Sequence, residues 1–326
     1  MKKLTNVLKK GSTYIIFLAA VLICVAISPD FFTLTNITNI GRQYAGLIIV
    51  AMGMLYVILT GGIDLSVGSI VALGSVLVST CLVAGMPLAT SMLVAILGGL
   101  ICGLITGILV AYAKMAAFIA SMAMMTMARG VAFVISNGSP IPTPKDSIIW
   151  LGQGAVGATV AEEGAAAMGG LPYLVIIAII VVVVFWFVQN YTAFGRIIIA
   201  IGSNETAVRL AGIRVKLYKT GVYVISGLCC ALAGILLCSR TAIGSPVVGQ
   251  SMELDAIAAC VIGGASLAGG EGSAVKAVIG VLILALIGNI MNLLAVPSYP
   301  QDIIKGIIIV ASVLLQTITS SNKKEE

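Results

Sequence analysis

Histidine is absent from this chain, and charged residues are scarce. Only 9% of the 326 residues are charged, whereas 60% are hydrophobic and the mean hydropathy is +1.16. Soluble globular domains carry about 25% charged residues, so this chain has too few to cover a surface that faces water. The lack of histidine also removes the commonest metal ligand and the side chain that titrates near neutral pH. The composition predicts an integral membrane protein without histidine-based chemistry.

Two further signatures of chemistry are missing, namely paired cysteines and a nucleotide-binding loop. The seven cysteines lie in apolar stretches without CxxC spacing, which favours a packing role over a disulfide framework or a metal site. The glycine-rich stretch 263–272 is not followed by the Gly-Lys-Ser/Thr of a phosphate-binding loop. We therefore expect a chain that is not an enzyme and holds no cofactor and no metal. The cysteines are Cys24, Cys81, Cys102, Cys229, Cys230, Cys238 and Cys260.

Long apolar runs fill most of the sequence. A helix needs about 20 apolar residues to cross the hydrocarbon core of a bilayer, and about ten such segments can be placed along the chain. The sequence thus predicts an all-α, polytopic membrane protein in which residues 1–326 form a single transmembrane domain. The expected spans are residues 12–28, 43–60, 66–85, 88–112, 117–136, 171–189, 218–239, 253–268, 276–295 and 302–318.

Spans 66–85 and 253–268 begin beside glycine or acidic residues, which suggests interrupted or re-entrant helices. Such helices are tolerated at membrane depth only where protein or water covers the exposed backbone. Acids at helix starts favour capping and packing, and contact with a translocation pathway is the alternative. The residues concerned are Gly61, Gly62, Asp64 and Ser66 for the first span, and Glu253 and Asp255 for the second.

The basic residues predict the orientation of the chain. With the N-terminus inside and ten crossings, 13 of the 18 lysines and arginines fall in cytoplasmic segments and only 3 in outer ones. Cytoplasmic loops of membrane proteins carry such an excess, so both termini are expected in the cytoplasm. The remaining two, Arg129 and Lys305, fall within or beside spans. The net charge of +6 therefore needs no nucleic-acid partner.

Two connections are too long to be simple turns. The outer one, residues 137–170, begins with Asn137-Gly138-Ser139-Pro140 and includes an Ala/Gly-rich stretch, which predicts turns followed by a small element. It is either a variable surface loop or a landing surface for an external partner. The inner connection, residues 190–219, carries a clearer signal.

A short helix is predicted inside the inner connection. Ser203 or Asn204 can cap its start, and Gly212 can end it. Glu205 suits the positive N-terminus and is spaced to form an ion pair with Arg209. About two turns of helix are not stable alone in water, so this element either lies on the membrane surface or docks a soluble subunit. Its apolar side consists of Ala207, Leu210 and Ala211.

The placement of the two interrupted spans suggests an internal duplication. If the chain divides into two sets of five spans, Asp64 starts the third span of the first half and Asp255 starts the third span of the second. Because five is odd, the two halves have opposite orientations. Inverted repeats with interrupted helices at matching positions flank the pathway of many transporters. The sequence therefore predicts an inverted five-plus-five repeat.

Small and amide-bearing residues mark contacts between helices. Gly99, Gly103 and Gly107 form a stripe at i, i+4 spacing that lets two helices approach closely. Asn289 and Asn292, with Gln301 beyond them, either line a pore or bond between helices.

Five motifs together resemble the membrane permease of ribose-type ABC sugar importers. They are ILTGGIDLSVGS at 58–69, AIGSNE at 200–205, AGI at 211–213, ELDAIAA at 253–259 and IGGASLAGG at 262–270, in the same order along residues 28–315. The resemblance implies that two copies form the pathway, that a cytoplasmic ATP-binding subunit drives it and that an extracytoplasmic sugar-binding protein delivers the substrate. It places the chain in the bacterial inner membrane.

By this resemblance, the helix within 190–219 couples the permease to the ATPase, and the outer loop 137–170 meets the binding protein. The expected cargo is a neutral monosaccharide, ribose above all, with a nucleoside or furanosyl signal molecule as the alternative. An ion-coupled carrier is disfavoured because the spans hold no histidine and few acids. The coupling residues are Ser203, Asn204, Glu205, Ala207, Arg209 and Gly212. The candidates for the pathway are Gly61, Gly62, Asp64, Ser66, Glu253, Asp255, Asn289 and Asn292.

Overall fold

The computed structural model describes residues 2–144, 147–157, 170–297, 299–304, 306–308 and 310. Helices dominate these residues, and the strands are only two residues long. The elements are α1 Lys2–Ile27, η1 Pro29–Phe32, α2 Leu34–Leu59, α3 Val67–Val83, α4 Leu88–Ala111, α5 Ala117–Ile135, β1 Ile141–Pro142, α6 Ile149–Gln153, β2 Ala155–Val156, β3 Leu171–Pro172, α7 Tyr173–Tyr191, α8 Ala193–Leu210, α9 Val215–Thr241, β4 Ile243–Gly244, α10 Met252–Ile262 and α11 Ala274–Leu293.

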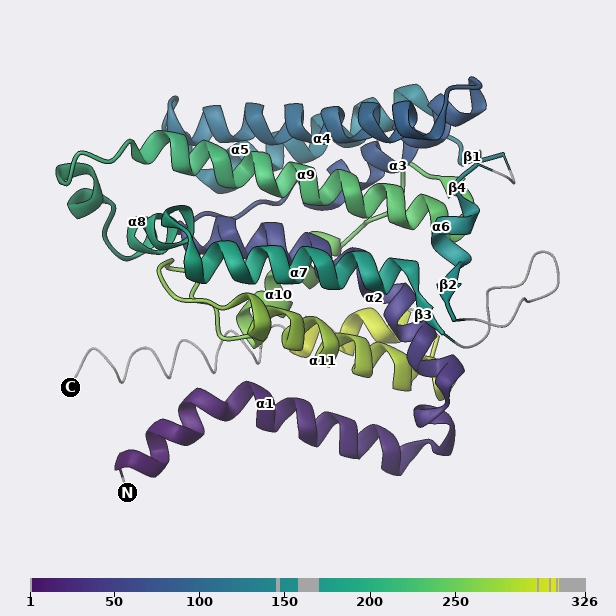
Figure 1. The fold of residues 1–326 in the computed structure, drawn as a ribbon, viewed down its shortest axis with the longest axis horizontal. Coiled ribbons are helices and arrows are strands. Elements are labelled where there is room, and N and C mark those ends of the chain that lie inside the picture. Colours follow the sequence, from purple (N-terminus) through teal and green to yellow (C-terminus); the bar gives the residue numbers. More distant parts are fainter. Residues whose placement is uncertain are drawn as a thin grey trace.

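Two antiparallel helices, α2 and α9, form the centre of the bundle. In Figure 1, α3, α4 and α5 lie above them, whereas α10, α11 and α1 lie below. Within their most apolar stretches, 83% of the α2 residues and 72% of the α9 residues are buried, against 22% for α7 and 28% for α5. The centre of the fold is therefore apolar on all sides, and the outer helices present apolar faces suited to lipid.

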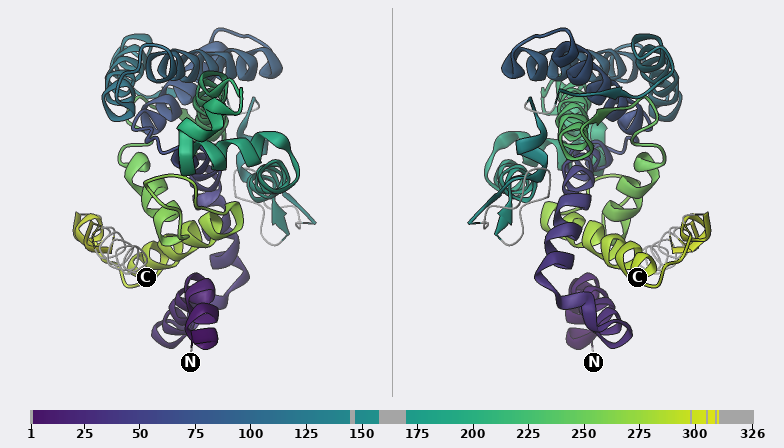
Figure 2. Two further views of the ribbon diagram at one scale, coloured as in Figure 1. Left: turned by 90° about the vertical axis from the view of Figure 1, so that its left-hand side faces the viewer. Right: turned by 90° about the vertical axis from the view of Figure 1, so that its right-hand side faces the viewer.

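Helix α1 lies at one edge of the molecule, as both views in Figure 2 show. It packs on α11 through a small apolar cluster that includes Cys24, Phe31 and Leu286. The largest cluster of buried residues is centred on α2 and α9, and a third, small cluster joins Ile201 and Val208 of α8 to Val215 of α9.

The glycine stripe of α4 packs directly on α9, which confirms the predicted close helix contact. A Cβ on Gly99 would lie 2.4 Å from the Gly227 carbonyl oxygen, and one on Gly103 would lie 2.3 Å from the Tyr223 carbonyl oxygen. A Cβ on Gly107 would lie 2.9 Å from the Cα and the carbonyl oxygen of Thr220. Real Cβ atoms do not approach oxygen so closely, so only glycine allows these two backbones to touch.

Among the described residues, six helices are long and apolar enough to cross a membrane. They are α2, α4, α5, α7, α9 and α11; Thr13–Ile27 and α3 are shorter apolar helices. Helix α10, with 11 residues, ends well before the predicted limit of 268. The reason is local, because Gly264 (φ +85°), two residues after the helix end, takes up the left-handed conformation. Most of the predicted span 302–318 lies outside the described residues, which include a helical stretch at 299–304.

Two small antiparallel strand pairs gather at the end of the molecule opposite α8 (Figure 1). β1 pairs with β4, with Ile141 opposite Gly244, and β2 pairs with β3, with Ala155 opposite Pro172. We refer to the two ends of the bundle as the α8 end and the β1 end. The predicted outer loop 137–170 thus begins with turns and the short helix α6. Most of its Ala/Gly-rich stretch 155–170, namely residues 158–169, lies outside the described residues.

Candidate functional site

The first interruption of the bundle, residues 60–66, joins α2 to α3 at the α8 end. We call it the first break. Gly61 has a φ of +76°, which favours glycine and allows the sharp turn after α2. Asp64, 1% exposed, accepts hydrogen bonds from the Ser66 amide (3.0 Å), the Ser66 hydroxyl (2.5 Å) and the Ser226 hydroxyl of α9 (2.8 Å). This carboxylate therefore fastens the break to the central helix α9.

Neighbouring helices hold the same break through a backbone carbonyl. The Ile63 carbonyl oxygen accepts from the Ser121 hydroxyl of α5 at 3.3 Å and from the Tyr223 hydroxyl of α9 at 3.5 Å. Either Asp64 or Ser66 has the side chain of a helix cap for α3. Ser66 occupies the N-cap position of α3, but its hydroxyl makes no cap bond to the helix and instead donates to Asp64.

The second interruption, residues 242–251, joins α9 to α10 at the β1 end. We call it the second break. Ala242 (φ +59°) and Ser251 (φ +63°) take up the left-handed conformation at its two limits. Between them, the Arg129 guanidinium of α5 donates from Nη1 to the carbonyl oxygens of Pro246 (2.7 Å) and Val248 (2.9 Å). A cation within the bundle thus satisfies the exposed carbonyls that an interrupted helix leaves unpaired.

The start of α3 meets the second break at Gly68. A Cβ there would lie 2.1 Å from the Gly249 carbonyl oxygen and 2.5 Å from Glu253 Oε2, so a side chain would force the two segments apart. Oε2 of Glu253 is buried and accepts no hydrogen bond from the described residues. Glu253 and Asp255 both lie in the first turn of α10, where acids are expected at the positive end of a helix.

The candidate amides bond to other amide side chains of the chain. Asn289 of α11 exchanges two hydrogen bonds with Asn36 of α2, at 3.0 and 2.7 Å. Asn292 accepts from Gln301 Nε2 at 2.9 Å. Of the two interpretations that the sequence left open, bonding between segments of the chain is therefore the one that the structure supports for Asn289.

The predicted short helix of the inner connection is present. Helix α8 is kinked at Asn204, whose φ of −159° is extended, and the Asn204 side chain accepts from the Ala207 amide at 3.0 Å. At the other end, the Gly212 amide bonds the Arg209 carbonyl and the Ile213 amide bonds the Val208 carbonyl, the glycine-ended arrangement typical of helix C-termini. Residues 204–212 therefore form a separate capped unit, which we call the capped helix.

One predicted contact of the capped helix is wrong. Glu205 does not pair with Arg209 but with Lys219 of α9, with 2.6 Å between Oε2 and Nζ. The fold brings α9 back beside the capped helix, and this tertiary contact replaces the local one. Ser203 does not cap the helix either, because its hydroxyl donates to the Ile199 carbonyl at 3.1 Å. The apolar residue Leu210 is 82% exposed at the tip of the unit.

A junction of glycines ties the base of the capped helix to the first break. A Cβ on Gly202 would lie 1.9 Å from the Leu59 carbonyl oxygen and 2.4 Å from the Gly270 amide nitrogen. The Gly270 amide also donates to the Leu59 carbonyl at 3.0 Å. One residue earlier, Gly269 packs against Gly61. The end of α2, the kink of α8 and the loop after α10 therefore meet at one point, which the local patterns in the sequence did not indicate.

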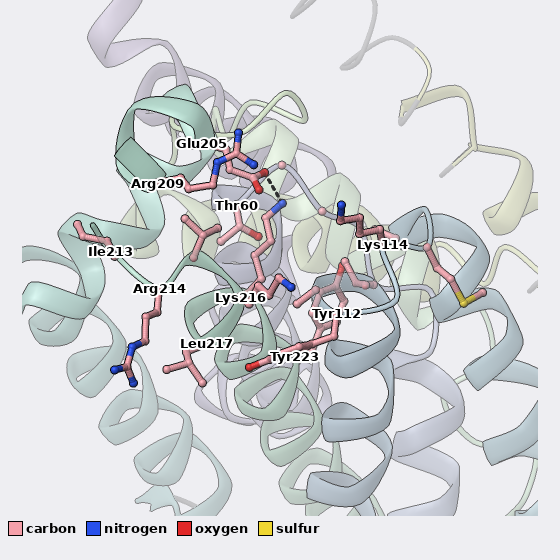
Figure 3. A pocket seen from close by; sticks show the side chains of 18 residues that line it. Thr60, Tyr112, Lys114, Glu205, Arg209, Ile213, Arg214, Lys216, Leu217 and Tyr223 are labelled. Carbon is pink, nitrogen blue, oxygen red and sulfur yellow. Dashed lines mark hydrogen bonds and ion pairs between the residues drawn. The ribbon is translucent and has the colours of Figure 1, made fainter. Parts of the chain in front are cut away.

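Beside this junction lies a cavity of about 850 Å³ (Figure 3). Its walls come from the turn between α4 and α5, from the capped helix and from the start of α9, and its floor includes the first break. Among the described lining residues, basic side chains predominate over one acid, Glu205. The sequence singled out Arg209 as a coupling residue but did not indicate that these cations gather around one cavity. The cations are Lys114, Arg209, Arg214, Lys216 and Lys219.

These features define a polytopic α-helical membrane protein with two interrupted helices, an arrangement found in many transporters. The chain belongs to the family described as the permease component of the branched-chain amino acid transport system, which matches residues 36–313.

The relatives of the chain include permeases named for sugars. It is 39% identical over 311 residues to the ribose import permease protein RbsC of Haemophilus influenzae, covering 95% of this chain and 94% of the relative. It is 40% identical over 322 residues to the RbsC protein of Escherichia coli K12, covering 98% and 95%. The xylose transport system permease protein XylH of Escherichia coli K12 is 36% identical over 334 residues, covering 87% and 85%. No solved structure matches the chain.

Proposed function

We propose that this chain is the membrane-spanning subunit of an ATP-driven importer and that its cargo is a neutral monosaccharide, ribose in the first place. The observation that carries this proposal is the identity of 39–40% to ribose import permeases over nearly the whole length of both chains. The match at 36% to a xylose permease makes xylose the second candidate. ATP hydrolysis then comes from a separate cytoplasmic subunit, and the substrate is delivered by an extracytoplasmic binding protein.

The proposed transmembrane domain comprises residues 1–326, with ten spans in two inverted sets of five. The packing of the described helices favours this arrangement. The second span of each set, α2 in the first and α9 in the second, crosses the centre, and the two run in opposite directions (Figure 1). Helix α4 packs on α9 in the same way as α11 packs on α2. Each helix that follows a break, α3 or α10, contacts the next helix along the chain. Span 302–318 would complete the second set.

The proposed pathway runs beside the two breaks and is completed by a second copy of the chain. Val247 within the second break is 48% exposed and Leu254 just after it is 50% exposed, so one copy does not enclose the break. Two copies related by a twofold axis would bring these surfaces together. Gly61, Gly62, Asp64, Ser66, Glu253 and Asp255 then act by shaping and holding the breaks, whereas Asn289 and Asn292 act in helix packing.

We assign the α8 end to the cytoplasm of a bacterium and the β1 end to the outside of its inner membrane. Both termini are then cytoplasmic. The coupling segment within 190–219 contacts the ATP-binding subunit through the capped helix, with its exposed Leu210, and the outer loop 137–170 meets the binding protein. In this arrangement the glycine junction carries motion of the capped helix to the first break.

The test is reconstitution of the permease in proteoliposomes with the ATP-binding subunit and the binding protein from the same operon. We expect uptake of labelled ribose that requires all three proteins and ATP, with xylose and a nucleoside as comparison substrates. Uptake of a nucleoside in preference to both sugars would move the cargo to the alternative class. Uptake by the permease alone under an ion gradient would refute the proposed importer.

A further inference from the structure

The basic cavity at the α8 end carries an excess of positive charge among the described residues that line it. Within that lining Glu205 is the one acid, and it already pairs with Lys219. Figure 3 shows the side chains of Lys114 and Lys216 on the side of the cavity opposite the capped helix. An excess of one charge in a concave site attracts a ligand of opposite charge, because the walls concentrate the field.

Two of the cations of this cavity, Lys216 and Lys219, have their side chains held by neighbouring residues of the chain. Lys216 Nζ lies 5.1 Å from the centre of the Tyr112 ring, a cation–π contact that fixes a flexible side chain. Lys114 has a φ of +57°, a conformation that costs a lysine about 1 kcal/mol or more where a glycine would be free of strain.

The floor of the cavity is the first break itself. Thr60, Gly61 and Gly62 line it together with Tyr223, whose hydroxyl bonds the Ile63 carbonyl. A ligand that fills the cavity would therefore touch the segment between α2 and α3. A volume of about 850 Å³ accommodates several side chains, which suits a peptide segment rather than a single ion.

We propose that the cavity receives an acidic segment of the ATP-binding subunit, which thereby contacts the first break directly. This inference rests on the proposed function and extends it, since it adds a second contact beside the capped helix. The exposed Leu210 provides an apolar contact and the cavity an electrostatic one. The capped helix projects beyond the ends of α4 and α9 (Figure 1), so a protein that docks on it reaches the mouth of the cavity as well.

The test compares charge reversals inside and outside the cavity. Permease variants are placed in nanodiscs of neutral phosphatidylcholine, and the affinity of the purified ATP-binding subunit is measured at two salt concentrations. We expect the double variant Lys114→Glu/Lys216→Glu to bind at least about tenfold more weakly and to lose most of the salt dependence. The control is Arg196→Glu, because Arg196 is an exposed cation of α8 that does not line the cavity; it should bind within about twofold of the wild type.

A cross-link locates the partner segment. With p-benzoylphenylalanine in place of Tyr112, illumination of the purified complex should label a peptide of the ATP-binding subunit that contains aspartate or glutamate. Unchanged affinity of the double variant overturns the inference. So does a cross-link to phospholipid alone, with loss of bound phosphatidylglycerol from the double variant in native mass spectrometry, because that result assigns the cavity to a lipid headgroup.

A third variant separates failure of this inference from failure of the proposed function. Leu210→Asp removes the apolar contact of the capped helix without touching the cavity. If Leu210→Asp abolishes binding and the cavity variant does not, only the acidic segment is wrong. If the ATP-binding subunit fails to bind the wild-type permease at all, the proposed function itself is refuted.

Discussion

The first break and the second break each follow a long central helix and lead into a shorter one, but different groups hold them. An acid, Asp64, gathers three hydroxyl and amide donors at the first break, whereas a base, Arg129, gathers two carbonyl oxygens at the second. Whether an acid or a base holds a break follows from the polar groups that the break leaves unpaired. At the first, donors near the start of α3 need an acceptor, and at the second, carbonyls between α9 and α10 need a donor.

The two breaks also differ in what surrounds them. The first lies beside the glycine junction, the capped helix and the basic cavity. The second contains β4, which pairs with β1. Helix α5 contacts both, through Ser121 at one and Arg129 at the other. One helix thus links a break at the proposed cytoplasmic end with a break at the proposed outer end.

The largest effect is expected from removing the acid of the first break. Asp64→Ala leaves the Ser66 amide, the Ser66 hydroxyl and the Ser226 hydroxyl without their acceptor in a buried site. We expect a loss of about 3 kcal/mol in stability, seen as a lower unfolding temperature of the purified permease, and loss of import. Asp64→Asn keeps an acceptor oxygen and should lose about 1 kcal/mol. Equal stability of wild type and Asp64→Ala would show that this carboxylate does not hold the break.

A smaller effect is expected from removing the base of the second break. Arg129→Met retains an apolar side chain but leaves the Pro246 and Val248 carbonyls without their donor, so we expect a loss of about 2 kcal/mol. Arg129→Lys should recover part of both stability and import. The neighbouring Gly130→Ala, which adds a methyl group to open space, is the matched control and should be neutral. A stable Arg129→Met variant with full import would contradict the assigned role.

The smallest effect is expected outside both breaks. The pair Asn36 and Asn289 joins α2 to α11, and hydrogen bonds between membrane helices average about 0.6 kcal/mol. A double-mutant cycle of Asn36→Ala and Asn289→Ala should give a coupling energy of that order and leave import nearly unchanged. A loss of import with normal stability would instead restore Asn289 as a residue of the pathway.

Local patterns predicted those parts of the structure that depend on neighbours in the sequence. The glycine stripe of α4, the Asn204 cap and the Gly212 helix end follow from spacing alone, and each is present. The positions of the interruptions also follow from glycines and acids beside apolar runs. The bond from Ser226 to Asp64 spans 162 residues of sequence, and no local rule indicates which distant hydroxyl meets a buried acid.

One tertiary contact and one local contact account for the predictions that were wrong. Glu205 is spaced for an ion pair with Arg209, but the fold places Lys219 of α9 beside it, and Glu205 pairs with Lys219. Ser66 occupies the cap position of α3, but its hydroxyl donates to Asp64, two residues away, and makes no cap bond. Arg129 was noticed as a base at membrane depth, and its two carbonyl partners, 117 and 119 residues away, became evident only from the fold.

The central claim is that the first break, and not the second, is joined to the ATP-driven end through the glycine junction. The direct measurement is the number of ATP molecules hydrolysed per ribose imported by the reconstituted complex of Gly202→Ala, compared with Arg129→Met and wild type. A methyl group at Gly202 would lie 1.9 Å from the Leu59 carbonyl oxygen, so the junction must open. The account predicts that this ratio rises in Gly202→Ala while the ATP-binding subunit still binds, and that Arg129→Met lowers import and hydrolysis together. An unchanged ratio in Gly202→Ala would contradict it.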